Sequence, residues 1–590
     1  MKFDFNTPIS PEREKYFNMV PFILFFLSIS ACLILFYDYI FFYQEKNTLF
    51  LLTREFLSEH LEKPGGLLTY SATFLTSLYY YPVAGGIILS LVITLISYLV
   101  FLISGRYSER KDALLPLGVG FALVYMQISD YRLSPENYLG LLFFSAIVLV
   151  TVLNPGVLKG WLPLIIAPLF YLFAGGFSFM FLLFMTLHYT FRREDKWFMK
   201  TLLLWLAMAI TVLLCSEFIF YQNKADLLLT GKLSDGLHNR LFILVAIVIT
   251  FYPFTKRMKK QLFLTGSRIE NLLIGVLAFV IITVILILKP DIKSRNYFHA
   301  EKLFYERKFN ELVEFHRANK PTNSLAIFMN NVALCETGRL NEELFSTMQN
   351  PDATLFLKWE MVNEILKKGG YFYYATGMIN EAHRWAYENM VMKGLTPEDL
   401  NMLIKTELIN GNYSMASKYI RLLGRTLFYS KEAARYNSLL SDNAVNSDPE
   451  LGHKRKIRVM NDFFTLTDDP LMNLRSLLLS GSMNNESLQY LAAVLLLKKD
   501  YNSIASIIPE FAEAGFTKLP SNLEEAVVAI SLVRKEQYEK IRDVKISEQT
   551  TSKWNRYLET FGRYRNDLRA AEPALRKEFG NTYWYYAFYK

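Results

Sequence analysis

Cysteine is scarce in this chain: only three occur among 590 residues, together with seven histidines. Cys32 and Cys215 lie inside apolar runs and Cys335 stands alone, so the sequence offers no disulfide framework and no Cys-x-x-Cys metal site. It also lacks a P-loop, a dinucleotide-binding GxGxxG, a GxSxG nucleophile elbow and an HExxH zinc helix. These absences exclude a disulfide-stapled scaffold and the common enzyme classes that such motifs define.

Charge is sparse before Pro290 and plentiful after it, although charged residues make up 20% of the whole chain. The formal net charge is +9, and most of the basic excess falls in short loops beside apolar runs. Such an excess is the usual topology signal of a membrane protein, so it does not indicate a nucleic-acid partner. We therefore predict a membrane domain over residues 1–290, surrounded by lipids, followed by a water-soluble part.

Several apolar runs are long enough to cross a hydrocarbon core of ~30 Å. The first run exceeds the ~7–15 apolar residues of a signal peptide, which predicts an uncleaved anchor. The predicted crossings are Phe17–Tyr43, Pro82–Ile103, Leu114–Ser129, Tyr138–Leu153, Thr201–Phe220, Leu241–Phe254 and Asn271–Leu288.

The region Trp161–Tyr189 is long for one crossing and contains Gly175-Gly176. If it forms two short segments broken at these glycines, all the basic loops lie on one side of the membrane, as the positive-inside rule requires. This interpretation gives about nine segments, a cytoplasmic N-terminus and a periplasmic C-terminal domain in a bacterial inner membrane. The basic loops contain Arg106, Arg110 and Lys111; Arg192, Arg193 and Lys196; and Lys256, Arg257, Lys259, Lys260 and Arg268.

The first predicted outer loop, residues 44–81, is expected to form a helical hairpin. Apolar residues from Leu49 to Leu61 recur at helical spacing opposite charged ones, which is typical of a helix lying in the membrane interface. Pro64-Gly65-Gly66 should end this helix before a second apolar stretch, Leu67–Tyr81. A hairpin that simply packs on the bundle is an equally good interpretation.

Beyond Pro290, apolar residues take helical spacing and no sustained alternation indicates strands. A turn pattern recurs, and two of its spacings bracket the ~34-residue tetratricopeptide period. In this pattern a glycine supplies the left-handed residue after one helix, and a small residue lets the next helix approach closely. The copies start at Lys308, Gly338, Gly377 and Gly411, with a weaker one at Lys499.

This pattern resembles the tetratricopeptide repeat, which implies an α-solenoid with a concave surface for a protein or peptide partner. The fold class we expect is therefore all-α: a polytopic helical membrane domain followed by a tetratricopeptide-like solenoid. We assign residues 291–443 to the repeats and 444–590 to further, irregular helical repeats. The tail Thr582–Tyr589 is rich in aromatic residues, and we expect it to cap the last repeat rather than to stack on sugar rings.

Acidic residues near the outer membrane boundary are the candidate catalytic groups. Asp38 is placed inside the first crossing, Glu45 follows it, and Asp130 opens the second outer loop. Carboxylates at membrane depth are costly and therefore suggest function. Next to Asp130, Ser134 and Pro135 are predicted to be the N-cap and first residue of the following helix.

The layout of residues 1–290 resembles the C-type glycosyltransferase superfamily, some members of which end in tetratricopeptide repeats. The resemblance implies a polyprenyl-linked sugar as donor, with Glu45 and Asp130 as catalytic base or ligands of a divalent metal. The paired acidic motif of that superfamily is missing here. We also expect Arg54 and Arg132 to bind a lipid phosphate in a groove between the hairpin and the Asp130 loop, or else to reach toward headgroups as ordinary interfacial cations.

A closer likeness is to uncharacterised polytopic membrane proteins of Bacteroidota, and it is carried by Glu45–Phe50, Pro64-Gly65-Gly66, His383-Arg384-Trp385 and Thr582–Tyr586. Two functions remain open from the sequence. One is a polyprenyl-phosphate-dependent glycosyltransferase acting in cell-envelope glycan assembly. The other is a non-catalytic membrane scaffold that binds envelope proteins through its repeat domain.

Overall fold

The computed structural model describes residues 11–107, 113–154, 156–157, 161–192, 196–220, 236–255, 270, 273–278, 280–281, 284, 291–359, 363–460, 469–480 and 483–590. These residues are all-α, and no strand occurs among them, as the sequence predicts. The chain divides into two compact units. Unit 1 contains residues 1–295 with 425–428, and unit 2 contains residues 296–424 with 429–590.

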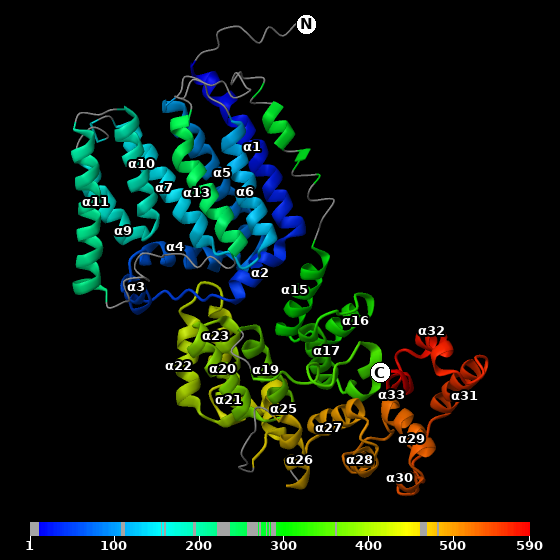
Figure 1. Ribbon diagram of the computed structural model, residues 1–590. Coiled ribbons are helices and arrows are strands. Elements are labelled where there is room, and N and C mark those ends of the chain that lie inside the picture. Colours follow the sequence, from blue (N-terminus) through cyan, green and yellow to red (C-terminus); the bar gives the residue numbers. More distant parts are fainter. Residues whose placement is uncertain are drawn as a thin grey trace. The chain divides into compact units, whose positions relative to one another are not determined.

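Unit 1 is a bundle of apolar helices (Figure 1). Helix α5 packs on α1, α6, α7 and α13, so it lies at the centre of the bundle. Its elements are α1 (Pro11–Phe36), α2 (Asp38–Lys46), α3 (Arg54–Leu61), α4 (Gly66–Ser77), η1 (Leu78–Tyr80), α5 (Pro82–Tyr107), α6 (Leu114–Ser129), α7 (Pro135–Leu153), α9 (Pro163–Ala174), α10 (Phe177–Arg192), α11 (Trp197–Leu214), η2 (Cys215–Ile219) and α13 (Gly236–Thr255).

Within the described residues, four helices are long and apolar enough to cross a membrane: Asn18–Phe36, Pro82–Tyr107, Pro135–Leu153 and Trp197–Ile219. Leu114–Ser129, Pro163–Ala174 and Arg240–Phe254 are shorter apolar helices. Half of the predicted crossing Asn271–Leu288 lies outside the described residues. Arg110, Lys111, Arg193 and the basic loop after Thr255 also lie outside them.

The first apolar run does not form one helix, which corrects our prediction for Phe17–Tyr43. Helix α1 ends at Phe36, and Tyr37 has a non-helical φ of −128° with ψ 22°. Asp38 therefore opens α2 instead of lying within the first crossing. A carboxylate in the first turn interacts favourably with the positive end of the helix dipole, which gives Asp38 a structural role.

The break at Gly175-Gly176 is confirmed, because α9 ends at Ala174 and α10 begins at Phe177. Gly175 has φ 57° and ψ −127°, a conformation that is essentially restricted to glycine. Gly65, with φ 76°, approaches this turn closely: its N–H donates to the Leu172 carbonyl at 3.1 Å. A Cβ on Gly65 would lie 3.1 Å from the Gly175 nitrogen. The close approach of Gly65 to Gly175 thus fixes the α9–α10 turn against the start of α4.

The helical hairpin is present, but its first helix is shorter than predicted. Helix α3 begins at Arg54, because Thr53 is extended and its side chain caps the helix by accepting the Phe56 N–H at 3.1 Å. The preceding apolar residues from Leu49 to Leu52 are therefore outside the helix. Helix α4 packs on α3, α7 and α9, so the hairpin is part of the bundle.

Unit 2 consists of short helices (Figure 1). Its elements are α15 (Ile292–Tyr305), α16 (Phe309–Ala318), α17 (Ser324–Glu336), α18 (Leu340–Glu343), η3 (Leu344–Ser346), α19 (Asn363–Ala375), α20 (Ile379–Lys393), α21 (Pro397–Asn410), α22 (Tyr413–Gly424), α23 (Ser430–Asn437), α24 (Asp442–Ser447), α25 (Pro449–Ile457), α26 (Pro470–Leu479), α27 (Asn485–Lys498), α28 (Tyr501–Glu513), α29 (Ser521–Val533), α30 (Lys535–Glu539), α31 (Glu548–Gly562), α32 (Leu568–Phe579) and α33 (Tyr583–Tyr589).

All five recurring turns contain a left-handed residue. Gly338, Gly377 and Gly411 have φ values of 71°, 83° and 80°. At the first and last turns the left-handed residues are Arg307 (φ 56°) and Lys499 (φ 55°), so these turns carry strain of ~1–2 kcal/mol each that glycine avoids. The packing is not limited to sequence neighbours, however, because α17 and α18 also contact α27.

The aromatic tail is docked, as expected for a cap. It forms helix α33, which packs on α29 and α32, and four of its aromatic side chains from Tyr583 to Tyr586 are buried. The Trp584 indole N–H donates to the Glu525 carbonyl at 2.7 Å, and the Tyr586 hydroxyl donates to the Leu497 carbonyl at 2.8 Å. Buried rings of this kind are not available for stacking on sugars.

Candidate functional site

Glu45 lies in the last turn of α2, where its side chain is buried. Its carboxylate is 3.9 Å from the Lys46 ammonium. The neighbouring Gln44 connects α2 to the second predicted outer loop: its side-chain N–H₂ donates to the carbonyls of Leu133 at 2.8 Å and Tyr131 at 3.2 Å. The structure thus brings the helix that carries Glu45 onto the loop that carries Asp130.

Asp130 is buried, and its carboxylate organises its own loop. Oδ1 accepts the backbone N–H of Arg132 at 2.9 Å, closing a turn in which an aspartate side chain takes the place of a backbone carbonyl. The Tyr131 ring packs edge-on against Tyr43 of α2, with centroids 4.7 Å apart. Ser134 then caps α7 through the Glu136 N–H at 3.2 Å, with Pro135 as the first helical residue, which confirms the predicted cap.

The two predicted phosphate-binding arginines are both exposed but lie on different elements. Arg132 extends from the loop, and its guanidinium lies 5.5 Å from the Tyr131 ring centroid. Arg54 occupies the first turn of α3, next to the capping Thr53. Within the described residues, no group of three His, Cys, Asp or Glu side chains is arranged to hold a metal ion.

Unit 2 contains a polar cavity of about 610 Å³. Helices α16, α17 and α18, the segment that follows α18, and the turn before α33 form its walls. The lining residues are Val313, His316, Arg317, Lys320, Asn330, Glu342, Glu343, Ser346, Thr347 and Asn581. Sequence reasoning did not identify this cavity, because its walls come from segments more than 200 positions apart.

His316 is buried in the wall of this cavity. Its Nδ1 is 3.1 Å from the Asn330 Oδ1, and an amide oxygen only accepts, so this contact assigns the proton to Nδ1 and leaves Nε2 as an acceptor. Burial lowers the pKa of His316, although the hydrogen bond to Asn330 opposes this shift. His316 is therefore a neutral imidazole with a fixed orientation at neutral pH.

The rim of the cavity carries paired charges of both signs. Glu343 accepts from Arg317 and Arg339, with closest N–O distances of 2.7 Å to each. Burial raises the pKa of Glu343, but the hydrogen bonds from the two arginines outweigh it, so the pKa lies below its ordinary value. Lys320, two residues after the end of α16, is exposed and adds a positive charge to the rim.

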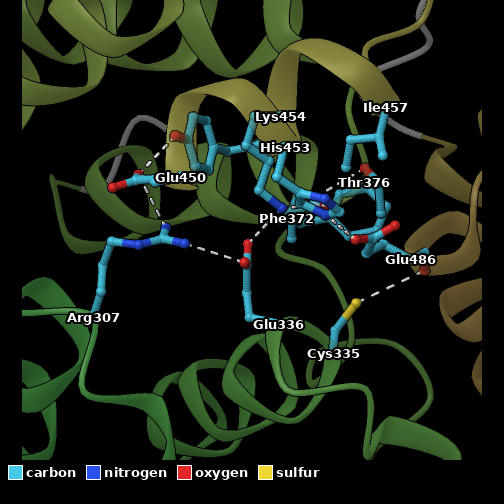
Figure 2. A network of polar contacts seen from close by, with 12 residues as sticks. Arg307, Cys335, Glu336, Phe372, Thr376, Glu450, His453, Lys454, Ile457 and Glu486 are labelled. Atoms are coloured by element: carbon cyan, nitrogen blue, oxygen red, sulfur yellow. Dashed lines mark hydrogen bonds and ion pairs between the residues drawn. The ribbon is translucent and has the colours of Figure 1, made fainter. Parts of the chain in front are cut away.

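A second group of charges lies in the interior of unit 2, around α25 (Figure 2). Arg307 bridges Glu336 at 3.2 Å and Glu450 at 3.3 Å, and Lys454 pairs with Glu336 at 2.8 Å. Glu450 also accepts from the Tyr374 hydroxyl at 2.7 Å. This network joins the α15–α16 turn to α17, α19 and α25.

The basic residues of α25 also bind the ends of two other helices. The Lys454 ammonium donates to the Ala375 carbonyl of α19 at 3.0 Å. Arg455 donates to the Leu408 and Ile409 carbonyls of α21 at 2.9 and 3.1 Å. Cations at these positions satisfy carbonyls that lack intrahelical partners and complement the helix dipoles. The network around α25 is therefore a structural brace, whereas the His316 cavity is an open polar site in unit 2.

The fold and these sites define an all-α protein that combines apolar helices of membrane-spanning length with a second unit of paired helices containing a polar cavity. The chain belongs to a family of unknown function, DUF6057, whose profile matches residues 15–590. Comparisons with curated proteins and with solved structures found no match.

Proposed function

We propose that the protein is a non-catalytic scaffold of the bacterial inner membrane, which binds a segment of an envelope protein in its second unit. The observation that carries this proposal is the polar cavity of about 610 Å³ around His316. The apolar helices of unit 1 support membrane insertion. The topology we propose has the N-terminus in the cytoplasm and unit 2 in the periplasm, since this arrangement places the basic loops inside.

The helix pairs of unit 2 support a tetratricopeptide-like binding surface. The left-handed residues at Gly338, Gly377 and Gly411 lie between paired helices, as such repeats require. The cavity walls include the pair formed by α17 and α18. Repeats of this kind commonly present recognition surfaces for peptides or proteins.

The chemistry of the cavity favours an extended peptide over an apolar ligand. Its walls offer a fixed imidazole acceptor at His316, hydroxyl and amide groups, and charges of both signs. A peptide backbone presents alternating donors and acceptors, and its side chains can match the charges of Lys320 and Glu342.

Lys320→Glu tests this proposal, because Lys320 lines the cavity and is exposed, so the change should not disturb folding. Lys518→Glu is the matched control, with the same charge change at an exposed position outside the cavity lining. The full-length protein is crosslinked in native membranes and its partners are quantified by mass spectrometry. We expect partners that the wild type and Lys518→Glu retain and that Lys320→Glu loses. Equal retention by both variants would refute the cavity as the binding site.

A second candidate function is the polyprenyl-phosphate-dependent glycosyltransferase. The observation that favours it is the Gln44 side chain, which joins the helix of Glu45 to the loop of Asp130. In this proposal Glu45 or Asp130 acts as base or as ligand of a divalent metal, and Arg54 and Arg132 bind the phosphate of the lipid-linked sugar.

Charge-removing variants distinguish the two functions. Asp130→Asn retains an oxygen that can accept the Arg132 N–H, so it removes the charge while preserving the turn. For a transferase, Glu45→Gln or Asp130→Asn should abolish activity, and a deletion strain should accumulate an undecaprenyl-linked sugar. For a scaffold, both variants should restore the deletion strain fully.

A further inference from the structure

The turn between α31 and α32 has a strained backbone. Arg565 and the following Asn566 are both left-handed, with φ values of 54° and 62°. Asparagine tolerates this conformation, whereas the Cβ of an arginine crowds the following carbonyl, a strain that glycine avoids. Two hydrogen bonds hold the turn: the Arg565 N–H donates to the Gly562 carbonyl at 3.0 Å, and the Asp567 N–H donates to the Tyr564 carbonyl at 3.0 Å. The arginine is thus fixed at a position that its backbone does not favour.

Long cationic side chains occupy two other left-handed positions of unit 2, and both have partners within the chain. Arg307 is bridged to two glutamates of the network around α25, and the Lys499 ammonium lies 5.7 Å from the Tyr586 ring centroid. The Arg565 side chain is exposed and, among the described residues, has neither an ion pair nor a ring contact. Its charge is therefore available to a ligand outside the chain.

Positive charge is concentrated around this turn. All the cations between residues 559 and 578 are exposed, and in the described part of the chain none of them forms an ion pair. These cations are Arg563, Arg565, Arg569, Arg576 and Lys577. Arg569 and Arg576 are seven positions apart in α32, so they share one face of the helix with each other.

The carboxylates of the same segment do not neutralise these cations. Three of the four are engaged by other groups: Asp567 by the first N–H groups of α32, Glu572 by the Tyr585 hydroxyl and Glu578 by Arg556. The fourth is Glu559, one turn before Arg563, and it forms no ion pair with any described residue. The turn therefore presents an excess of unpaired positive charge.

Exposed apolar side chains lie among the arginines. Tyr564 is 38% exposed, and Leu568 is 50% exposed. Guanidinium groups bind phosphate oxygens at two points, and tyrosine rings favour the headgroup region of a bilayer. Arginines combined with exposed aromatic and apolar side chains are typical of protein surfaces that lie in a membrane interface. This composition favours a lipid surface over an acidic peptide, which would match the charges alone.

The bilayer is also the partner that unit 2 meets at the highest effective concentration. Unit 1 contains helices long and apolar enough to cross a membrane, and the chain connects the two units covalently. A tethered surface binds in an intramolecular step, so contacts that would be weak in solution become significant.

We propose that the α31–α32 turn docks on anionic phospholipids of the bilayer that holds unit 1. Arg563, Arg565 and Arg569 contact lipid phosphates, and the exposed side chains of Tyr564 and Leu568 enter the headgroup region. The docking uses no residue of the His316 cavity and none of the Glu45 and Asp130 region. It therefore goes beyond both proposed functions, and it depends only on membrane insertion of unit 1.

A fluorophore next to the turn tests this docking in the full-length protein. Ala570 is exposed, and the three native cysteines are buried, so Ala570→Cys can be labelled selectively with a polarity-sensitive dye. The labelled protein is placed in nanodiscs of phosphatidylcholine that contain increasing fractions of phosphatidylglycerol. We expect the emission to shift to the blue as the anionic fraction rises. High salt should reverse the shift, because it screens the charges.

Two triple variants with the same loss of charge are compared in the labelled protein. The test variant carries Arg563→Gln, Arg565→Gln and Arg569→Gln. The control carries Lys518→Gln, Lys535→Gln and Lys540→Gln, at exposed positions of other segments. One cation near an anionic surface contributes about fivefold in binding, so the test variant should lower the ratio of docked to undocked protein by roughly 100-fold. The control should dock like the wild type. Tyr564→Ala should weaken docking without changing its salt dependence.

Four results would contradict this assignment. Equal shifts for the two triple variants, or an equal shift in discs of phosphatidylcholine alone, would overturn it. A shift caused only by added phosphatidylglycerol vesicles would show that the turn does not dock on the protein's own bilayer. A shift caused by polyglutamate, but not by phosphatidylglycerol, would identify an acidic protein as the partner instead. Lys320→Glu should dock normally, so loss of the scaffold function and loss of docking can be distinguished.

Discussion

Replacing Glu450 with glutamine should test whether the network around α25 braces unit 2. The Glu450 carboxylate contacts Arg307 at 3.3 Å (Figure 2). It also contacts Lys405 at 3.0 Å and the Tyr374 hydroxyl at 2.7 Å. Glutamine retains the size and an acceptor for Tyr374, but it removes the charge that compensates the two cations. The variant therefore removes this ion-pair partner from the partly buried Lys405 and leaves Arg307 paired with Glu336.

The size of the effect follows from the pKa of Glu450. Burial raises this pKa, but Lys405 and Arg307 outweigh burial and lower it from 4.5 to about 2. At 1.36 kcal/mol per pKa unit, the difference corresponds to ~3 kcal/mol of stability, in the range found when one partner of a buried ion pair is removed. Unit 2 has 291 residues, so at ~2.1 cal/mol/K of unfolding entropy per residue a loss of this size should lower its unfolding midpoint by about 5 °C.

The pH dependence has a defined sign. Because the folded-state pKa lies below the unfolded one, the carboxylate contributes its full stability above about pH 4.5 and loses it as the pH falls toward 2. The difference between wild type and Glu450→Gln should thus be constant near neutral pH and should shrink below pH 4.5.

Thermal unfolding of the full-length protein in uncharged detergent measures this difference, with Glu513→Gln as the control at an exposed position of α28. A double variant with Arg307→Gln should be less destabilised than the sum of the single variants, since each single change breaks the same Arg307–Glu450 ion pair. Equal midpoints for Glu450→Gln and Glu513→Gln, or a difference that does not change below pH 4.5, would refute the brace.

Three further predictions concern the packing of unit 2. Gly377→Ala should destabilise the protein far more than Gly338→Ala: both residues have positive φ, but a Cβ on Gly377 would lie 2.3 Å from the Ile457 carbonyl oxygen, whereas nothing lies within 4 Å of a Cβ on Gly338. The Gly338 variant should lose ~1–2 kcal/mol of stability, which is the cost of the strain in a left-handed alanine. Equal losses of stability for the two variants in thermal unfolding would contradict the importance of the contact at Gly377. Lys368→Met should cost ~3–5 kcal/mol, because Lys368 is buried and pairs with Glu301 at 2.8 Å; a denaturant midpoint unchanged from wild type would contradict this. Trp584→Ala should cost ~3–5 kcal/mol and speed limited proteolysis near the C-terminus, and an unchanged cleavage rate would argue against the docked cap.

Local chain geometry was predictable from sequence wherever one or two residues decide it. The bounds of α6 agree with the predicted Leu114–Ser129, and the chain breaks at Gly175-Gly176. Ser134 and Pro135 begin α7 as expected. Apolar length, a glycine at positive φ and a capping hydroxyl act over a few residues, so their outcome needs no knowledge of distant segments.

The tertiary structure decided the features that depend on distant residues. The run of apolar residues up to Tyr43 gave no sign of the break at Tyr37, because hydrophobicity alone does not distinguish a continuous helix from two packed ones. The network of Arg307, Glu336 and Glu450 and the cavity around His316 were also unpredictable, since their members come from helices far apart in the chain. A charge in the sequence of a helical repeat looks the same whether it faces water or a buried partner. Only the packing of the helices determines which charges are desolvated. Desolvation in turn determines how much these residues contribute to the free energy of unfolding.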